Sequence, residues 1–262
     1  MTEADIAVIG GSGFYSFLED AEERHVPTPY GDPSGPVALG TVAGRRVAFL
    51  PRHGAHHAFP PHRINYRANA WALRSLGVRQ VLAPCAVGSL TPDLGPGTVV
   101  VPDQLVDRTH GRAATFVETG ACHVPFADPY CPRVSDAVLQ ASPDATRGGT
   151  MVVVEGPRFS TRAESQHYAA QGWSLVNMTG HPEAVLAREM QQCYAAVALV
   201  TDLDAGLESG SGVSQDEVFA LFAANLERLR GMLADAIATL PDPDGCTCAT
   251  WADGIELTYE VP

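Results

Sequence analysis

The chain has 262 residues, of which 45% are hydrophobic and 18% are charged. This is the balance of a globular protein, and no linker or change of composition divides the chain, so we expect a single domain. The formal net charge of -13 argues against nucleic acids and anionic membranes as partners, because both would repel the protein. No apolar run has the length of a membrane span, and the first residues lack the basic and apolar regions of a signal peptide, which favours a cytoplasmic location.

The first expected strand covers residues 6–9 and runs into the glycine-rich segment 10–13. Backbone N–H groups of such a segment can converge on an anion, and Ser12 adds a hydroxyl donor, so the segment is a candidate phosphate site. It is not a dinucleotide fingerprint, since Ser16 stands in place of the third glycine, and no Lys follows as in a Walker loop. A tight turn without a ligand is the alternative.

Two further strands are expected over residues 37–41 and 46–50, and the second leads into the segment PRHGAHH at 51–57. In an acidic chain, Arg52 and His53 directly after a buried strand form a candidate anion site, because Arg offers a planar fork of donors and His adds another donor. The histidines of this segment do not predict a metal site, since no carboxylate or Cys lies at helical spacing nearby.

The middle of the chain predicts a helix over residues 65–76 and a strand over 78–83. That strand is expected to end in a loop of small residues, 84–89, where backbone could approach a ligand closely. A strand follows at 98–101. Residues 107–132 have little periodicity and contain His123, which is typical of a binding loop or a subunit contact.

Another strand, 151–154, leads into EGPRFS at 155–160, and Thr161 with Glu164 forms a capping box that predicts a helix start. Phe159 at this corner either stacks on a planar base or fills the core. Near the C-terminus, Ser214 and Glu217 form a second capping box. It predicts one long packing helix whose apolar stripe runs from residue 219 to 240.

The segment 175–206 carries the strongest signal of chemistry. A short strand ends in the polar cluster 177–180, Pro182 opens a helix, and the apolar strand 195–200 then ends at TDLD, 201–204. Ligands of open α/β sheets bind outside the carboxyl ends of the strands, so Asp202 and Asp204 are expected at that edge. The alternative is that both carboxylates only cap a turn.

The six cysteines show no CxxC spacing, and most are expected to be buried as small apolar side chains. Cys246 and Cys248 are separated by one residue near the C-terminus. They could form a strained redox pair, contribute to a metal site, or remain a free pair without a role, and the scarcity of cytosolic bridges favours the last interpretation.

Six motifs occur in a fixed order: GGSG at 10–13, PRHGAHH at 51–57, AVGSL at 86–90, EGPRFS at 155–160, NMTGHPE at 177–183 and TDLD at 201–204. Together they resemble the trimeric purine nucleoside phosphorylase family, and more closely its S-methyl-5'-thioadenosine phosphorylase branch. The resemblance implies an α/β fold with a central mixed, twisted β-sheet flanked by helices. It places the phosphorylase domain at residues 1–241 and a tail with a CxC motif at 242–262.

The resemblance also implies a reaction: phosphorolysis of S-methyl-5'-thioadenosine, or a closely related 5'-deoxyadenosine, to adenine and a ribose 1-phosphate. Inorganic phosphate would be the co-substrate, with no cofactor and no metal, and the protein would be a homotrimer. The phosphate residues implied are Ser12, Arg52, His53, Cys85, Ala86 and Thr179. The substrate residues implied are Phe159, Met178, Asp202, Asp204 and His123, and the specificity residues are Ser160, Gln215 and Val218. Of these, His123 matches a residue that reaches the 5' group of a neighbouring subunit's substrate.

The chemistry is consistent with these positions. Cleavage of the glycosidic bond leaves negative charge on the purine, and an acid at Asp202 would discharge it by protonation or a hydrogen bond. Phosphate beside the sugar would act as nucleophile and stabilise the cation. Asp204, or backbone near it, would accept a hydrogen from an exocyclic amine. A 6-oxo base would place its own acceptor oxygen against that acceptor and be rejected.

The chain departs from the family pattern at two places: Cys85 replaces the usual Thr or Ser, and Gly180-His181 replaces a more apolar pair. The nearest alternative function is phosphorolysis of 6-oxopurine nucleosides or methylthioinosine, but the similar branch that does so has Asn at the position of Asp202. A hydrolytic nucleosidase would not need Arg52 and His53. A nucleotide-binding regulator without turnover would leave the acid idle.

Overall fold

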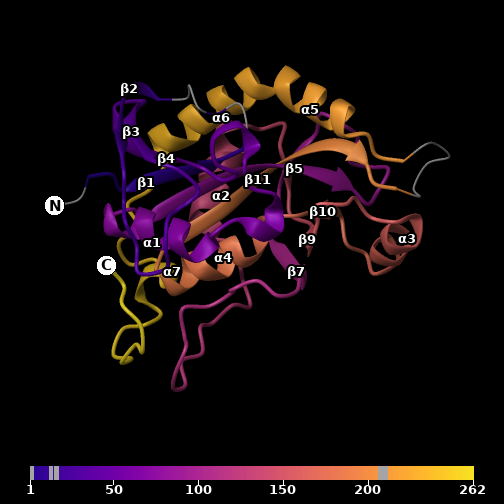
Figure 1. Ribbon diagram of the computed structural model, residues 1–262. Coiled ribbons are helices and arrows are strands. Elements are labelled where there is room, and N and C mark those ends of the chain that lie inside the picture. Colours follow the sequence, from indigo (N-terminus) through magenta and orange to yellow (C-terminus); the bar gives the residue numbers. More distant parts are fainter. Residues whose placement is uncertain (1–2, 12–13, 15–17, 206–211) are drawn as a thin grey trace.

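The computed structural model describes residues 3–11, 14, 18–205 and 212–262. Its centre is an 11-stranded mixed sheet, in which one path of neighbours runs β2-β3-β4-β1-β5-β10-β9-β7. The second path leaves β5 through β11 (Cys193–Leu203) to β6 (Val99–Val101) and β8 (Thr146–Arg147). Figure 1 shows helices on both sides of this twisted sheet, as the resemblance implied. The strands of the first path are β1 (Ile6–Gly10), β2 (Glu19–Arg24), β3 (Val37–Val42), β4 (Arg45–Pro51), β5 (Gln80–Ser89), β7 (Gln104–Arg108), β9 (Thr150–Val154) and β10 (Leu175–Asn177).

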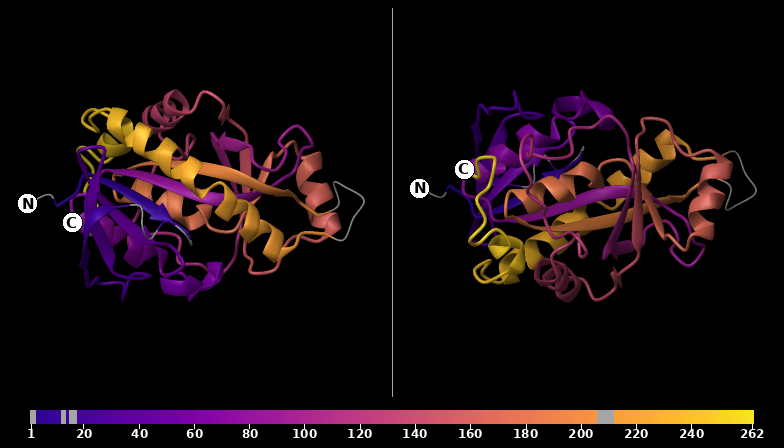
Figure 2. Two further views of the ribbon diagram at one scale, coloured as in Figure 1. Left: turned by 90° about the horizontal axis from the view of Figure 1, so that it is seen from above. Right: turned by 90° about the horizontal axis from the view of Figure 1, so that it is seen from below.

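The alternation of β1 shows how the two faces of the sheet are filled. Ile6 and Val8 belong to one apolar core, with α2 (Pro132–Ala141) and α6 (Leu226–Thr239). Ala7 and Ile9 belong to the other core, with α1 (Tyr66–Ser75) and α4 (Gly180–Glu189). Successive side chains of a strand point to opposite faces, so a continuous apolar run indicates a strand covered on both sides. Figure 2 shows α6 crossing one face of the sheet.

The strand β5 is longer than the sequence predicted, because the expected loop 84–89 continues the strand. Its pairing with β11 (Cys193–Leu203) extends from Gln80 to Ser89. On its other side, β5 pairs with β1 as far as Leu82 and with β10 only from Gly88 onward. Pro84 lies between the part of β5 that pairs with β1 and the part that pairs with β10. Its missing N–H therefore removes no hydrogen bond between strands on that side. Between Leu82 and Gly88, β5 pairs with neither β1 nor β10, and the site described below lies along this stretch.

The strand β11 also continues past its predicted end at Val200. A register shift lies between Val200 and Asp202, after which Asp202 pairs with Gly88 of β5. Such a bulge re-aims the side chains that follow it. Asp202 is therefore fixed within a strand, and the interpretation of Asp202 as a turn cap is wrong.

The predicted long C-terminal helix is two helices, α5 (Gln215–Ala224) and α6, which meet at Asn225. Ser214 precedes α5 but its side chain makes no capping hydrogen bond, so the second capping box is absent. The first capping box is present at Thr161, at the start of α3 (Arg162–Ala170). The predicted packing role falls mainly on α6, because α5 has no fully buried residue and only its half-buried Leu221 and Phe222 pack against the same core.

The remaining elements are short: β6 (Val99–Val101), β8 (Thr146–Arg147), the 3-10 turns Ala55–His57 and Pro61–Arg63, and α7 (Thr247–Thr250). In the described part of the chain, none of the helices combines the length and apolarity that crossing a membrane requires. Trp251 donates its indole N–H to Arg188 O at 2.8 Å, and Tyr259 donates its hydroxyl to Glu189 O at 2.8 Å. The segment after Pro241 thus packs against the end of α4.

Candidate active site

A cavity of about 540 Å³ opens along β5, at the interval between its β1 and β10 partners. Five residues of β5 line it, together with the ends of β10 and β11, the segment after β4, the corner after β9, and α5. The predicted site residues on its wall are Arg52, His53, Cys85, Ala86, Phe159, Ser160, Met178, Thr179, Asp202, Asp204, Gln215 and Val218. The fold therefore brings together residues that lie more than a hundred positions apart in the sequence.

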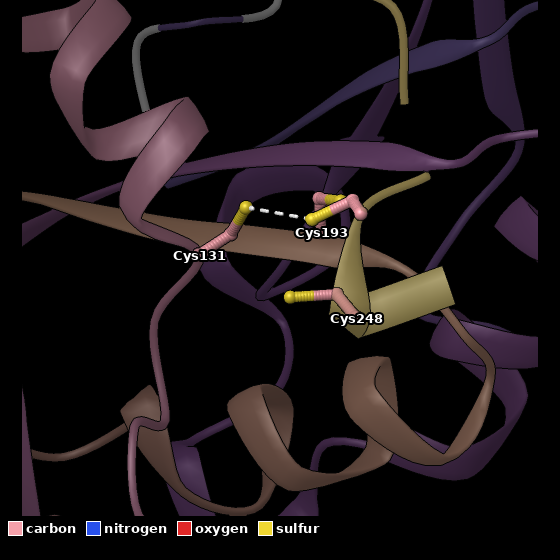
Figure 3. A group of neighbouring side chains, drawn as sticks. Cys131, Cys193 and Cys248 are labelled. Carbon is pink, nitrogen blue, oxygen red and sulfur yellow. Dashed lines mark hydrogen bonds between the residues drawn. The ribbon is translucent and has the colours of Figure 1, made fainter. Parts of the chain in front are cut away.

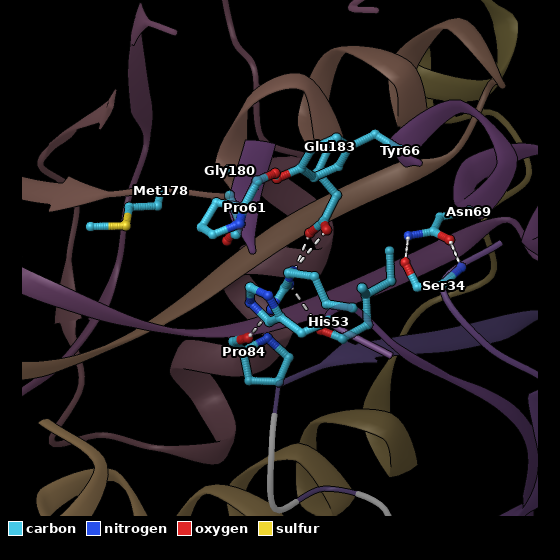
Figure 4. Close-up of polar contacts among 12 residues, drawn as sticks. Ser34, His53, Pro61, Tyr66, Asn69, Pro84, Met178, Gly180 and Glu183 are labelled. Carbon is cyan, nitrogen blue, oxygen red and sulfur yellow. Dashed lines mark hydrogen bonds and ion pairs between the residues drawn. The ribbon is translucent and has the colours of Figure 1, made fainter. Parts of the chain in front are cut away.

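Arg52 is buried at the cavity wall and is held by a residue that the sequence analysis missed. Its Nε and Nη2 donate to the two carboxylate oxygens of Glu183, each at 2.8 Å (Figure 4). Nη1 donates to Pro84 O and Nη2 also donates to Ile9 O, each at 2.9 Å. Burial opposes the charged form, but the Glu183 carboxylate outweighs it and holds the pKa of Arg52 above its ordinary value.

These bonds use four of the five guanidinium N–H groups of Arg52. The planar fork expected to receive phosphate is therefore occupied by Glu183. Within the described part of the chain, one Nη1 N–H remains for a ligand. Glu183 also accepts a hydrogen bond from the Tyr194 hydroxyl at 2.8 Å. A buried hydrogen-bond network therefore holds the Arg52 guanidinium in place at the cavity wall.

His53 lies beside Arg52 as a neutral ring. Its Nδ1 is 2.9 Å from Phe59 O, so Nδ1 carries the proton and Nε2 is left as an acceptor. Burial, with smaller contributions from His57 and Arg52, lowers the pKa of His53 to about 3. The ring stacks on His57 with centroids 4.0 Å apart. The donor expected from the sequence is therefore used within the protein, and the neutral ring can only accept a hydrogen bond from a ligand.

The corner after β10 is organised by Asn177. Its Oδ1 accepts the backbone N–H groups of Thr179 and Gly180, each at 2.7 Å, and its Nδ2 donates to Ala86 O at 3.1 Å. This ties the start of α4 to β5 and presents Met178 and the Thr179 hydroxyl on the cavity wall. Asn177 thus positions three of the predicted site residues, although the sequence marked it only as part of a polar cluster.

Cys85 is buried on the same wall, and burial raises the pKa of its thiol to about 12. It therefore stays protonated and offers only a weak S–H donor where a hydroxyl was expected from the family pattern. Main-chain groups of β5 face the cavity here, because none of the described strands pairs with this side of β5 between Leu82 and Gly88. Any strong contact to an anion at Cys85 and Ala86 must come from the backbone.

Two carboxylates lie at the end of β11. Burial, together with the nearby Asp204 carboxylate, raises the pKa of Asp202 to about 6, although the Thr201 hydroxyl at 2.8 Å opposes the shift. Asp204 is buried and accepts the Ser165 hydroxyl at 2.6 Å. Asp202 is therefore suited to carry a proton near neutral pH, as a general acid must.

The outer wall of the cavity is apolar and partly open. Phe159 is 36% exposed on the corner after β9, and Ser160 next to it has a buried hydroxyl without a hydrogen-bond partner among the described residues. From α5 come Gln215, Val218 and Phe219, and Phe219 lies edge-on to His57 at 5.9 Å. Phe219 is 47% exposed, so α5 covers the cavity with Val218 and Phe219, while its Leu221 and Phe222 pack against the core.

Two predicted residues are not placed in this cavity. Ser12 lies outside the described residues, although its neighbour Gly11 is on the cavity wall. His123 is exposed on the loop between β7 and α2 and does not line the cavity of its own chain. Its expected contact with a neighbouring subunit's substrate stays a prediction.

Arg112, from the same loop, is a second residue that the sequence analysis missed. Its guanidinium donates to the backbone oxygens of Met178 at 3.0 Å and His181 at 2.6 Å. It also bonds Glu155 Oε2 at 3.0 Å. Arg112 thus joins the corner after β9 to the corner after β10. No pattern in the sequence links position 112 to either corner, because the link exists only in three dimensions.

Most of the cysteines are buried free thiols, as predicted. The tail residues Cys246 and Cys248 are buried beside Cys131 and Cys193, a grouping that the sequence did not indicate. Figure 3 shows Cys131, Cys193 and Cys248 of this group. Cys122 lies apart from this group and is half-buried.

Comparison with known proteins identifies the family. The model of the phosphorylase superfamily matches residues 5–238. The chain belongs to this superfamily. The match ends close to Pro241, and the tail that follows packs on the superfamily domain as described above.

Two relatives cover almost the whole chain. One is named S-methyl-5'-thioadenosine phosphorylase, from Mycolicibacterium smegmatis, and is 59% identical over 98% of this chain and 99% of its own. The other is named purine nucleoside phosphorylase, from Streptomyces coelicolor, and is 58% identical over 99% and 98% of the two chains.

Solved structures of superfamily members have the same fold. A methylthioadenosine phosphorylase from an Antarctic soil metagenomic library is similar with a TM-score of 0.88 and 40% identity, covering 95% of this chain and 91% of the other. The methylthioadenosine phosphorylase of Schistosoma mansoni in complex with adenine has a TM-score of 0.86 and 38% identity, covering 90% and 91%.

Proposed function

We propose that this protein is a pentosyltransferase that converts S-methyl-5'-thioadenosine and phosphate to adenine and 5-methylthioribose 1-phosphate. One observation carries the proposal: Asp202, a carboxyl group whose pKa is raised to about 6, shares a cavity with the buried cation Arg52. The names of the relatives from Mycolicibacterium smegmatis and Schistosoma mansoni support the same reaction.

In this mechanism Asp202 donates its proton, or a hydrogen bond, to the purine as the glycosidic bond breaks. The donor matters because negative charge develops on the base only as it departs, so the stabilisation is greatest in the transition state. A bound purine removes more water from Asp202 and thereby favours its protonated form further.

Phosphate occupies the other part of the cavity in this proposal. The remaining N–H of Arg52, the Thr179 hydroxyl and backbone N–H groups of β5 hold its oxygens, and Ser12 would add a further donor. Nε2 of the neutral His53 accepts a hydrogen bond from the hydroxyl of a monoprotonated phosphate. The anion then attacks the sugar carbon and offsets the positive charge that builds there. The reaction itself needs neither cofactor nor metal.

Base selection follows from the two carboxyl groups. Asp204 accepts a hydrogen from the 6-amino group, and the protonated Asp202 serves the ring nitrogen, so a 6-oxo base is disfavoured. The apolar cover of Val218, Phe219 and Phe159 suits a methylthio group at the 5' position, with Ser160 and Gln215 shaping its entrance. The name of the Streptomyces coelicolor relative makes purine nucleoside phosphorolysis the second candidate.

Product analysis with and without phosphate tests the proposal. We expect adenine release from S-methyl-5'-thioadenosine only when phosphate is present, and slower release of hypoxanthine from methylthioinosine or inosine. Equal activity without phosphate would establish a hydrolase instead. Faster turnover of the 6-oxo nucleosides would assign the protein to the second candidate, and absence of turnover would indicate a binding protein.

We also propose a homotrimer in the cytoplasm, in which His123 of one subunit completes the 5' end of a neighbour's site. The exposed position of His123, outside its own cavity, fits this arrangement. Light scattering of the purified protein measures the subunit number, and a monomer with full activity would exclude a role for His123 between subunits.

A further inference from the structure

Four buried cysteines converge from three parts of the chain (Figure 3). Cys131 is the residue before α2, Cys193 begins β11, and Cys246 and Cys248 belong to the tail. Their four sulfur atoms all lie within 4.8 Å of one another. The cluster is formed by tertiary structure, since Cys131 and Cys246 alone are 115 positions apart in the chain.

The spacing of the sulfurs matches a tetrahedral cation. Zinc binds thiolates at about 2.3 Å, which places the corners of its tetrahedron about 3.8 Å apart. The sulfurs of Cys131 and Cys246 are already 3.7 Å apart. Cys131 also contacts the sulfurs of Cys193 and Cys248, so one sulfur touches all three others. Two disulfides need only pairwise approach at about 2.0 Å, and they do not require all four sulfurs to meet at one centre.

The surroundings suit a thiolate site. The backbone N–H of Val134, in the first turn of α2, donates to the Cys131 sulfur, and Cys131 stands at the positive end of that ten-residue helix. The buried guanidinium of Arg188 acts electrostatically on Cys248. Four thiolates and one divalent zinc carry two negative charges in excess, and these groups offset part of that charge.

We propose that Cys131, Cys193, Cys246 and Cys248 bind one structural zinc ion per chain. Each thiol that binds releases its proton to solvent as its S–Zn bond forms, and no redox partner is required. All four positions are filled by protein, so the site has no open coordination position and is structural rather than catalytic. It lies apart from the cavity, because none of the four cysteines lines its wall.

The consequence is a fixed C-terminal tail. The zinc ion joins the tail to the start of β11 and the start of α2, which are adjacent through the hydrogen bond from Cys131 N to Tyr194 O at 2.8 Å. Beyond the cysteines, Tyr259 stacks on Phe116 at 5.8 Å. Phe116 belongs to the loop that carries Arg112 and His123. Zinc therefore orders, through the tail, the base of a loop that reaches the active site.

Metal analysis of the untagged full-length protein tests the site. After dialysis against metal-free buffer, elemental analysis is expected to give about one zinc per chain. Replacement by cobalt should give the visible absorption of a tetrahedral thiolate site. Cys248→Ser and Cys131→Ser should each reduce bound zinc by more than about tenfold. Cys122→Ser, which changes a cysteine outside the cluster, should keep the wild-type stoichiometry.

A count of thiols in the unreduced wild-type protein decides between zinc and disulfides even if a variant does not fold. Denaturation with a chelator should yield all six thiols of the chain together with the released zinc. Two or four thiols, with the matching loss of hydrogen mass, would show disulfides and overturn the proposal. Six thiols without bound metal, or iron in place of zinc, would overturn it as well.

Discussion

At the scale of single residues, the site depends on side chains whose chemistry is changed by burial. Asp202 and His53 are ordinary residue types, and neither is exceptional in the sequence. In the fold, burial raises the pKa of Asp202 to about 6 and lowers that of His53 to about 3, so one becomes a proton donor and the other a neutral acceptor. In the proposed reaction, Asp202 would therefore protonate the departing base, and His53 would accept a hydrogen bond from the phosphate.

The pKa of Asp202 predicts how the reaction depends on pH. Only the protonated carboxyl can discharge the purine, so kcat/KM should fall as pH rises above about 6, approaching tenfold per pH unit. Asp202→Asn should lower kcat/KM by about 10²-fold or more and remove this dependence. Steady-state kinetics across pH, with thermal unfolding to confirm the fold, measures both effects. An Asn variant with the parental rate would exclude the acid role.

Glu183 predicts a coupled loss of stability and phosphate binding. Glu183→Gln takes the negative charge from a buried pair and should destabilise the protein by about 3 kcal/mol. Because Arg52 then loses its fixed position, KM for phosphate should rise more than KM for the nucleoside. Tyr194→Phe is the matched control, since it removes only one hydrogen bond to Glu183, at a cost of about 1 kcal/mol. Equal effects of the two variants in denaturant titrations would contradict this account.

At the scale of elements, β5 is the strand on which the site depends, because the change of its neighbour from β1 to β10 opens the cavity. Gly88 lies where β10 and β11 close around this strand. A Cβ at Gly88 would lie 2.9 Å from Val176 Cγ1 and 3.1 Å from Asp202 Oδ1. Small size is therefore required at this position in the strand.

Gly88→Ala is expected to destabilise the protein by about 1–3 kcal/mol and to reduce turnover, because the added methyl group displaces Asp202. Gly95→Ala is the control, since a Cβ there would meet no atom within 4 Å. Equilibrium unfolding and kcat measure the two effects separately. If Gly88→Ala is as stable and active as Gly95→Ala, the close approach has no functional importance.

The helix α5 is expected to act on substrate selection rather than on stability. Phe219 is 47% exposed, so Phe219→Ala should change the unfolding free energy by less than about 0.5 kcal/mol. It should nevertheless raise KM for S-methyl-5'-thioadenosine more than KM for adenosine. Ile255 is 48% exposed and lies outside the cavity wall, so Ile255→Ala should alter neither value. Unchanged kinetics in both variants would exclude contact between α5 and the 5' group.

At the scale of the whole molecule, the tail after Pro241 is part of the fold. It buries Cys246, Cys248, Ala249 and Ala252, and it caps backbone oxygens at the end of α4. Truncation after Pro241 should therefore lower the free energy of unfolding by about 3 kcal/mol or more, from lost burial and hydrogen bonds. Denaturant midpoints of the full and truncated chains measure this difference. An unchanged midpoint would mean that the contacts of the tail do not contribute to the free energy of unfolding.

The sequence by itself determined the fold class and most elements near the site. Continuous apolar runs predicted β1, β9 and the buried part of β11, and the Thr161 capping box predicted the start of α3. These signals are local, since side-chain periodicity and capping depend on neighbours in the chain. The ordered motifs then predicted most of the residues on the cavity wall. The expectation that they share one edge of the sheet is wrong, because β9 and β10 run antiparallel to β5 and β11.

Only the tertiary structure decided the features that depend on contacts between distant segments. The length of β5 follows from its pairing with β11. The Arg52 guanidinium is bound by Glu183, which is 131 positions away in the chain. The four cysteines likewise meet only after folding. Burial and pairing are properties of the whole arrangement, and the local pattern around a residue does not contain them. For that reason the sequence could indicate which side chains reach the site, whereas the fold determined their protonation and their partners.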